Sequence, residues 1–340
     1  MQAYILTSNL GMRFRFGEAL GAYTKAQNNA QRITVSEYLH SDALWSALVN
    51  AWAFCHPESV ENFIAECRNG SFKLSSIFYC VDYHGKQVFF LPKPVSLNLI
   101  QSDESSKSEK IKFISKGIWE SGCLPKEWFD PNKCTLLQNE SMVALKSEIN
   151  TPINLFAIET LPKVRARNLN DREDALFYET NLFLLNGENY QVNWYFITEN
   201  NLPENLQDNF KDAMQTLVNL GIGGDRSSGC GSLTEYRKTD FIVKPDVSQS
   251  QTSTTNYRAS LSLIAPNENE LNKNSLYQII KRGGRPLEKN NCLPMIQMLR
   301  EGAVFDTEIK GRIVTLSNNP PILRYGMNLD IHLHNNFINN

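Results

Sequence analysis

The sequence lacks the excess of positive charge that free-standing nucleic-acid-binding proteins usually carry. Its 340 residues contain 34 lysines and arginines against 36 aspartates and glutamates, which gives a net charge of −2. This balance argues against a protein that binds nucleic acid over most of its surface. It still allows a basic track on one face, as in a subunit of a larger particle whose other faces meet protein.

Long apolar runs are also missing. Runs such as residues 43–55 are interrupted by polar side chains and are too short to span a bilayer. The first nine residues have neither a basic start nor a long apolar segment, so they do not resemble a signal peptide. We therefore expect a cytoplasmic protein.

Paired cysteines and clustered metal ligands are absent as well. No Cys-x-x-Cys pair occurs, and the number of cysteines is odd: Cys55, Cys67, Cys80, Cys123, Cys134, Cys230 and Cys292. This pattern predicts reduced thiols and not a disulfide framework or a zinc site. No cluster of Asp, Glu and His suggests a metal, so we expect no metal and no cofactor.

Glycine, by contrast, is concentrated in one stretch, residues 221–233 (GIGGDRSSGCGSL). Glycine tolerates positive φ and close backbone approach, so such a loop can curl until several N–H groups face one concavity that binds an anion. Arg226 adds a planar group suited to phosphate, and Ser227 and Ser228 add hydroxyl donors. The alternative is a structural loop that needs glycine only for its turns.

The order of elements around this loop restricts the ligand. Apolar spacing predicts a helix over 210–220 before the loop and an extended segment over 230–243 after it. A Walker-type loop or a dinucleotide fingerprint needs the order strand, loop, helix, together with its own glycine spacing. An extended polyanion crossing the loop therefore fits better than a nucleotide.

Two other basic segments are candidate phosphate contacts. Arg13 and Arg15 alternate with Phe14 and Phe16, a mixture that suits RNA because phosphates are paired and bases stacked. The equally strong alternative is a loop held on the core by the two phenylalanines. A loop at 281–285 (KRGGR) supplies Arg282 and Arg285.

The densest basic segment is 163–172 (KVRARNLNDR). On a strand, Lys163, Arg165 and Arg167 share one face, so they can follow a phosphate backbone. The alternative is a strand edge that its charges protect from pairing.

His40 and Ser41 precede a predicted helix whose apolar residues, Leu44, Leu48, Val49, Trp52 and Ala53, are spaced to face a core. Ser41 is a favoured N-cap residue. A histidine at this place could be a general base for RNA cleavage, but no second acid or base accompanies it, and capping and packing explain the same residues.

Around these motifs the sequence predicts an α+β protein of two units. Residues 1–240 contain a strand at 2–7, helices from 41 and at 59–67, and hairpins at 72–82/86–91 and 177–185/190–198 around His84-Gly85 and Asn186-Gly187. Residues 101–111 read as a polar surface insertion, 113–151 have no clear period, and 245–256 read as a linker. Residues 257–340 give four strand-like runs, at 257–264, 275–281, 311–317 and 327–333, with a helix at 293–300.

These segments together resemble the RAMP superfamily of CRISPR proteins, most closely the family of subunit four of the type III-A (Csm) interference particle. Four blocks carry the likeness, in the family's order: 14–18 (FRFGE), 39–48 (LHSDALWSAL), 221–229 (GIGGDRSSG), and 301–305 (EGAVF) with 324–326 (RYG). The third is the most specific. The family pattern has a basic residue at the position of Asp225 and histidine at that of Arg15.

The resemblance implies two ferredoxin-like (RRM-like) domains, at 1–240 and 257–340, with a glycine-rich loop and an inserted thumb in or beside 163–172. It implies a non-catalytic subunit in antiviral defence that caps the 5′ repeat-derived tag of crRNA and joins the large polymerase-like Cas subunit to the backbone Csm subunits. The predicted RNA-binding residues are Arg13, Arg15, His40, Ser41, Lys163, Arg165, Arg167, Asn168, Arg172, Gly223, Gly224, Arg226, Ser227, Ser228, Arg282 and Arg285.

Two alternatives remain open. A metal-independent, repeat-processing endoribonuclease of the same superfamily would use His40. The resemblance implies that the glycine-rich loop of such nucleases lies near the C-terminus. In this sequence, more than a hundred residues follow Gly221. A sister subunit of another type III complex would have different partners and the same chemistry.

Overall fold

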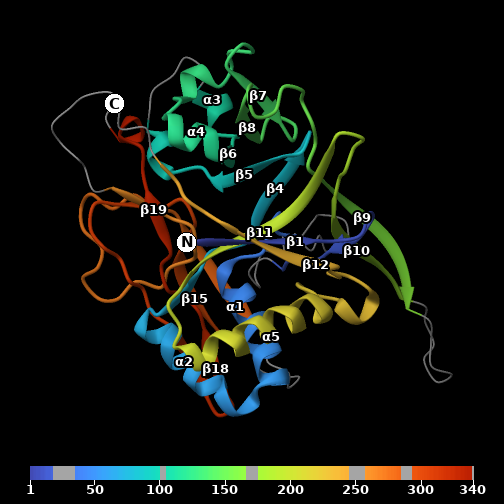
Figure 1. Ribbon diagram of the computed structural model, residues 1–340, viewed down its shortest axis with the longest axis vertical. Coiled ribbons are helices and arrows are strands. Elements are labelled where there is room, and N and C mark those ends of the chain that lie inside the picture. Colours follow the sequence, from blue (N-terminus) through green and yellow to red (C-terminus); the bar gives the residue numbers. More distant parts are fainter. Residues whose placement is uncertain (18–34, 100–104, 166–174, 245–256, 285–292, 339–340) are drawn as a thin grey trace.

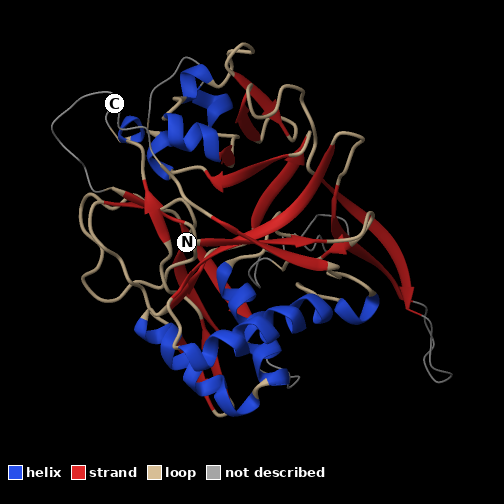
Figure 2. Ribbon diagram, in the orientation of Figure 1, coloured by secondary structure: helices blue, strands red, loops and turns tan. Residues whose placement is uncertain are grey.

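The computed structural model describes residues 1–17, 35–99, 105–165, 175–244, 257–284 and 293–338. A nine-stranded sheet runs through its centre, with α1, α2 and α5 together in the lower part of the view and α3 and α4 in the upper part (Figures 1 and 2). Within the described residues, no helix has both the length and the apolar character needed to cross a membrane.

The first half of this sheet has a βαββαβ arrangement, as predicted for residues 1–240. Its strand order is β12-β1-β11-β4, every neighbouring pair is antiparallel, α1 follows β1, and α5 connects β11 to β12. The elements are β1 (Gln2–Thr7), α1 (Ser41–Cys55), β4 (Phe78–Tyr83), β11 (Tyr190–Asn200), α5 (Glu204–Leu220) and β12 (Glu235–Asp240). The predicted order of helix, glycine-rich loop and strand is thus confirmed.

Helix α1 packs on α5 through the apolar face that its sequence predicts. Leu44, Leu48 and Trp52 are buried, and the Trp52 ring stacks on Phe63 of the next helix with ring centroids 4.1 Å apart. Ala53, predicted to face the core, is exposed, because the buried stripe instead continues through Ala51. After η1 (Pro57–Ser59), α2 (Val60–Asn69) confirms the second predicted helix.

The sheet continues beyond β4 into a region that the sequence left unassigned. β4 and β5 (Lys86–Pro92) form the hairpin predicted around His84-Gly85, and β5 then pairs with β6 (Phe113–Ser115). β6 lies parallel to β8 (Met142–Leu145), which pairs with β7 (Cys134–Leu137). Small elements complete this region: β3 (Phe72–Leu74) on β11, η2 (Val95–Asn98), α3 (Ser105–Ser108), α4 (Lys116–Ser121) and η3 (Pro125–Glu127).

A separate ribbon is formed by β9 (Phe156–Arg165) and β10 (Ala175–Leu184), which pair along their whole length and project from the body (Figure 1). The short β2 (Arg13–Phe14) pairs with the base of β10. The predicted hairpin of 177–185 with 190–198 is therefore wrong, although both strands exist. The Asn186-Gly187 turn separates two sheets, since β10 pairs with β9 and β2, whereas β11 pairs with β1, β3 and β4.

The C-terminal region consists of small sheets that pack against the central body. Their strands are β13 (Arg258–Ser260), β14 (Ile279–Gly284), β15 (Leu293–Leu299), β16 (Val304–Phe305), β17 (Val314–Asn318), β18 (Pro321–Arg324) and β19 (Asp330–His332), followed by η5 (Asn335–Phe337). The helix predicted over 293–300 is wrong: the segment forms the strand β15, in which Met298 and Leu299 are buried. The described residues after 256 contain no α-helix, and the second ferredoxin-like unit stays a prediction.

Candidate nucleic-acid interface

Three segments far apart in the sequence meet at one end of α5: the glycine-rich loop, β2, and the base of the β9–β10 ribbon. The Arg13 guanidinium donates to the Ser228 carbonyl at 3.0 Å, and Arg15 forms an ion pair with Asp225. On the ribbon, Lys163 of β9 pairs with Glu179 of β10. The structure thus brings together three predicted RNA-binding cations and the glycine-rich loop.

Three glycines are required here because the backbone crosses itself closely. Gly221, Gly223 and Gly231 all have positive φ. A Cβ on Gly223 would lie 2.8 Å from the Arg15 carbonyl oxygen, and one on Gly231 would overlap the Ile222 carbonyl oxygen. A side chain on Gly223 would therefore push the loop away from the segment of Arg15 and Phe16, whereas side chains on Gly221 and Gly231 would force apart the two ends of the loop itself. This supports the structural interpretation for these glycines.

The predicted nest of free amides is only partly present. The Gly224 amide donates to Arg15, and the Gly231 amide donates to Arg13. The Ser228 and Cys230 amides both donate to the Asp225 carbonyl. These donors hold the loop in shape and are not free for a ligand, so anion binding must rest mainly on the exposed side chains.

The outer edge of the loop, Arg226–Ser228, forms the short helix η4 and is exposed together with Gly224 and Gly229. Within the described part of the chain, Arg226 makes no hydrogen bond or ion pair through its guanidinium. A fully hydrated arginine beside two serine hydroxyls is available for a phosphate. We call this surface, Arg226–Ser228 with Arg13, the loop face.

Around the buried Cys230, carboxylates offset part of the positive charge of the site. Burial would raise the pKa of Glu179, but its hydrogen bond from Lys163 and the charges of Lys163 and Arg15 lower it below its usual value. Glu179 therefore remains an anion. Burial raises the pKa of the Cys230 thiol, which lies 3.8 Å from Glu179 and 3.7 Å from Asn181. The carboxylates of Glu179 and Asp225 offset two of the four cations.

His40 is not part of this surface, which corrects its prediction as an RNA contact. It is 3% exposed, and its Nδ1 lies 2.8 Å from the Glu301 carboxylate at the junction with the C-terminal region. Glu301 also accepts from the hydroxyls of Ser76 and Tyr38. The imidazole belongs to a buried network and has no open face for RNA or for a substrate.

Ser41 and Arg282 are corrected in the same way. The Ser41 hydroxyl does not cap α1; it accepts the Leu263 amide at 2.9 Å. Arg282 is 6% exposed and donates twice, at 2.9 Å, to the buried Asp42, which also pairs with Arg324. These residues join α1 to the C-terminal region. A partner 240 residues away was not visible in the sequence.

Some predicted contacts lie outside the described residues: Arg167, Asn168, Arg172 and Arg285. Arg165 ends β9, and only its backbone is described. The sequence reasoning also missed exposed apolar side chains on the ribbon, namely Ile158 (44% exposed), Val164 (63%) and Tyr178 (48%). The apolar and aromatic residues spread along 156–165 and 175–184 were the available signal.

The comparisons with known proteins agree with this geometry. Residues 253–333 match the family model of the CRISPR Csm4 C-terminal domain. A chain of the Csm3–Csm4 subcomplex in the type III-A CRISPR-Cas interference complex matches with a TM-score of 0.67 at 18% identity, covering 98% of this chain and 100% of that chain. A chain of the Csm1–Csm4 cassette with AMPPNP matches with a TM-score of 0.54 at 16% identity, covering 98% and 97%. Csm4 is the subunit common to both assemblies.

The chain has the Csm4 fold. The resemblance to this RAMP family, read from four short blocks, is thereby confirmed. At such low identities, the likeness to the Csm4 structures concerns the fold alone. No curated protein matches the sequence.

Proposed function

We propose that this chain is the Csm4 subunit of a type III-A CRISPR complex and that it binds the 5′ repeat-derived tag of crRNA without cutting it. The match over 253–333 and the Csm4 fold support the identity of the subunit. The loop face supports the role. Arg226, which has no partner among the described residues, lies exposed with two serine hydroxyls beside the half-buried Arg13 at the base of a projecting ribbon.

The exposed guanidinium of Arg226 is the main support for the proposal. Most cations near it are already neutralised, since Arg15 pairs with Asp225 and Lys163 with Glu179. The guanidinium of Arg226 has no such partner among the described residues, so a phosphate would complete its hydrogen bonding. Ser227 and Ser228 would donate to the same or the next phosphate.

The candidate general base of the nuclease alternative is His40, which is buried. His40 is enclosed by Glu301 and the Tyr38 ring, whose centroid lies 4.7 Å from that of the imidazole. A general base must come within hydrogen-bond reach of the proton it removes. We therefore propose a binding site and assign no catalytic residue.

We further propose that the chain joins a Csm1-type large, polymerase-like subunit to a Csm3-type backbone subunit. The solved relatives are chains of assemblies that contain Csm4 with Csm3 or with Csm1. Affinity purification of the tagged chain should recover both subunits together with RNAs that share one 5′ tag. Recovery of the chain alone would contradict this role.

The direct test is Arg226→Ala in the purified complex, with crRNA retention measured from low to high salt. Loss of one phosphate contact should lower retention and reduce the slope of log K against log salt by about 0.7. Arg237→Ala is the matched control, because Arg237 is an exposed arginine on β12 that pairs with Asp82. An unchanged slope in Arg226→Ala would remove Arg226 from the interface.

The endoribonuclease alternative is tested by an RNA cleavage assay. Repeat RNA incubated with the chain in EDTA should remain intact. Cleavage that disappears in His40→Ala would favour the endoribonuclease.

A further inference from the structure

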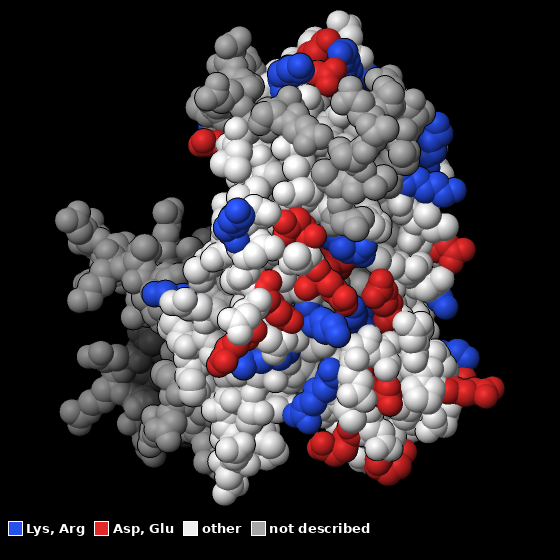
Figure 3. All heavy atoms as spheres, turned by 90° about the vertical axis from the view of Figure 1, so that its left-hand side faces the viewer, with Lys and Arg blue, Asp and Glu red and all other residues white. Residues whose placement is uncertain are grey.

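A second basic site lies away from the loop face, where the C-terminal end of α2 meets the loops of the C-terminal region. A cavity of about 560 Å³ is lined there by Arg68, Lys73, Lys310 and Arg312, with Glu308 as the single carboxylate among its lining residues. Figure 1 places α2 and the C-terminal strands on one side of the molecule, and Figure 3 shows basic and acidic side chains gathered on that side. In this cavity cations outnumber carboxylates four to one.

The loop that carries two of these cations is held in place by backbone contacts. Glu270 accepts the amides of Lys310 and Gly311, each at 3.2 Å, and Asn267 donates to the Gly311 carbonyl at 3.1 Å. Gly311 has a positive φ and lies against the Gly326 carbonyl, where a Cβ would overlap. The carboxylate of Glu270 is thus engaged by amides, and the loop presents Lys310 and Arg312 from a fixed backbone.

The opposite wall is equally defined. Helix α2 ends at Asn69, and the left-handed conformation of the next residue, Gly70, turns the chain toward β3, so Arg68 and Lys73 face the same cavity from two elements. Lys73 has a distant partner, Glu199, at 3.7 Å. Among the described residues, Arg68, Lys310 and Arg312 have no side-chain ion pair. Such unpaired like charges around one hollow repel each other, and an anion would relieve that repulsion.

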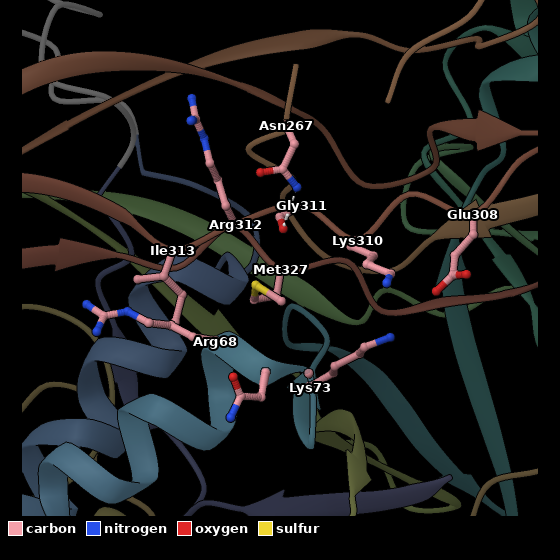
Figure 4. Close-up of a pocket in the computed structure, with 11 residues that line it drawn as sticks. Arg68, Lys73, Asn267, Glu308, Lys310, Gly311, Arg312, Ile313 and Met327 are labelled. Atoms are coloured by element: carbon pink, nitrogen blue, oxygen red, sulfur yellow. Dashed lines mark hydrogen bonds between the residues drawn. The ribbon is translucent and has the colours of Figure 1, made fainter. Parts of the chain in front are cut away.

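The two lysines extend toward one side of the cavity, and the two arginines extend away from them in different directions (Figure 4). In Figure 4, the ammonium groups of Lys73 and Lys310 extend toward the Glu308 side, whereas Arg68 lies on the opposite side beside Ile313, and Arg312 also extends away from the lysines. Ile313 and Met327 supply the apolar part of the lining. A compact anion would contact only the lysines or only an arginine. A ligand with two separated negative groups and an apolar part between them would contact both.

We propose that this cavity binds a ribonucleotide ligand with two phosphates one nucleotide apart, one at the lysines and one at an arginine. Guanidinium and ammonium groups are the usual protein ligands of phosphate, and the volume lies in the range of small-ligand sites. The ligand is either a free dinucleotide or a segment of RNA, and both present the same phosphates. The site is independent of the proposed tag-binding loop face.

The test measures binding of 5′-phosphorylated diuridylate (pUpU) and of UMP to the purified full chain by calorimetry. pUpU should bind at least tenfold more tightly than UMP, because UMP reaches only the lysines or only an arginine. Lys73→Ala/Lys310→Ala and Arg68→Ala/Arg312→Ala should each reduce pUpU affinity to that of UMP, and Glu308→Gln should raise it. The matched control is Arg237→Ala/Lys238→Ala, which removes two exposed charges from β12 and should change nothing.

A competition experiment then distinguishes a segment of RNA from a free dinucleotide as the natural ligand. An eight-nucleotide RNA with a 5′-hydroxyl that displaces pUpU identifies an RNA segment, and failure to displace it identifies a free dinucleotide. Equal affinity for pUpU and UMP, or pUpU binding that survives both double substitutions, would overturn the proposal. Arg226→Ala should leave pUpU binding unchanged, so this site and the loop face can fail separately.

Discussion

Two arginines, Arg226 and Arg282, lie close to glycine pairs in the sequence, but the first is exposed in the structure and the second is buried. Arg226 follows Gly223-Gly224 and is exposed on η4. Arg282 precedes Gly283-Gly284 and is buried against Asp42. Glycine-rich basic segments therefore predict a loop with a cation and do not predict whether the cation faces water. The position of a carboxylate elsewhere in the chain decides that.

The energetic roles differ in the same way. Burial would raise the pKa of Asp42, but Arg282 and Arg324 lower it below its usual value, so a charged triad is enclosed in the protein. Removing one partner from such a group leaves the others without compensation. An exposed arginine such as Arg226 keeps its hydration and contributes little to folding. One region stabilises the fold, and the other remains available for a ligand.

Asp42→Ala should have the largest effect, because it removes the carboxylate that pairs with the buried Arg282 and the partly buried Arg324. The free energy of unfolding should fall by about 3–5 kcal/mol, measured by urea denaturation. The control Asp208→Ala removes an exposed aspartate that pairs with Lys211 and should change stability by less than about 0.5 kcal/mol. Similar losses in both variants would mean that the triad is not a stabilising element.

The second comparison uses two glycines in the same loop. Gly229 and Gly231 both have positive φ, but a Cβ on Gly229 meets nothing within 4 Å, whereas one on Gly231 overlaps the Ile222 carbonyl. Gly229→Ala should cost about 1–2 kcal/mol through backbone strain alone. Gly231→Ala should cost about 1–3 kcal/mol more, because the neighbouring backbone must move. Equal losses in urea denaturation would show that the loop gives way freely at Gly231.

Sequence reasoning recovered the elements that are set by short-range signals. The alternation at 2–7, the helical spacing from Leu44 to Trp52 and the His84-Gly85 turn each appear in the structure as predicted. Strand pairing was harder. Asn186-Gly187 is an equally good turn signal, but β10 and β11 pair with other strands because long-range partners compete for them.

The candidate site could be predicted in part for the same reason. Arg13 and Arg226 were predicted because basic residues beside aromatics or glycines are a local pattern, and the structure places both at the candidate site. Glu179 was missed as the partner of Lys163, since only the pairing of β9 with β10 places them side by side. His40 was misassigned because Glu301, which encloses it, lies 261 residues away.

The buried network should also make stability depend on pH. Burial would raise the pKa of Glu301, but its contacts with His40 and Ser76 lower it below the ordinary value of 4.5. A carboxyl whose pKa is depressed on folding contributes stability above its unfolded pKa and loses it as pH falls through the folded pKa. The free energy of unfolding should therefore decline as the pH falls below 4.5.

Glu301→Gln isolates this contribution. The variant should be less stable at pH 7, and its decline below pH 4.5 should be shallower than that of the wild type by up to about 1.4 kcal/mol per pH unit. Urea denaturation from pH 7 to pH 3.5 measures both slopes. Identical slopes would place the acid-sensitive group elsewhere, with Asp42 the next residue to substitute.

The smallest effect on folding belongs to Arg226→Ala. Because the guanidinium is exposed and has no partner within the described residues, its removal should change the free energy of unfolding by less than about 0.5 kcal/mol. The same variant should weaken RNA retention, whereas Arg282→Ala should weaken folding and leave the RNA affinity of the folded fraction unchanged. Measuring the free energy of unfolding and the RNA affinity of both variants compares the two regions in one experiment. If Arg282→Ala reduced RNA affinity at full stability, the buried triad would have to be placed in the interface after all.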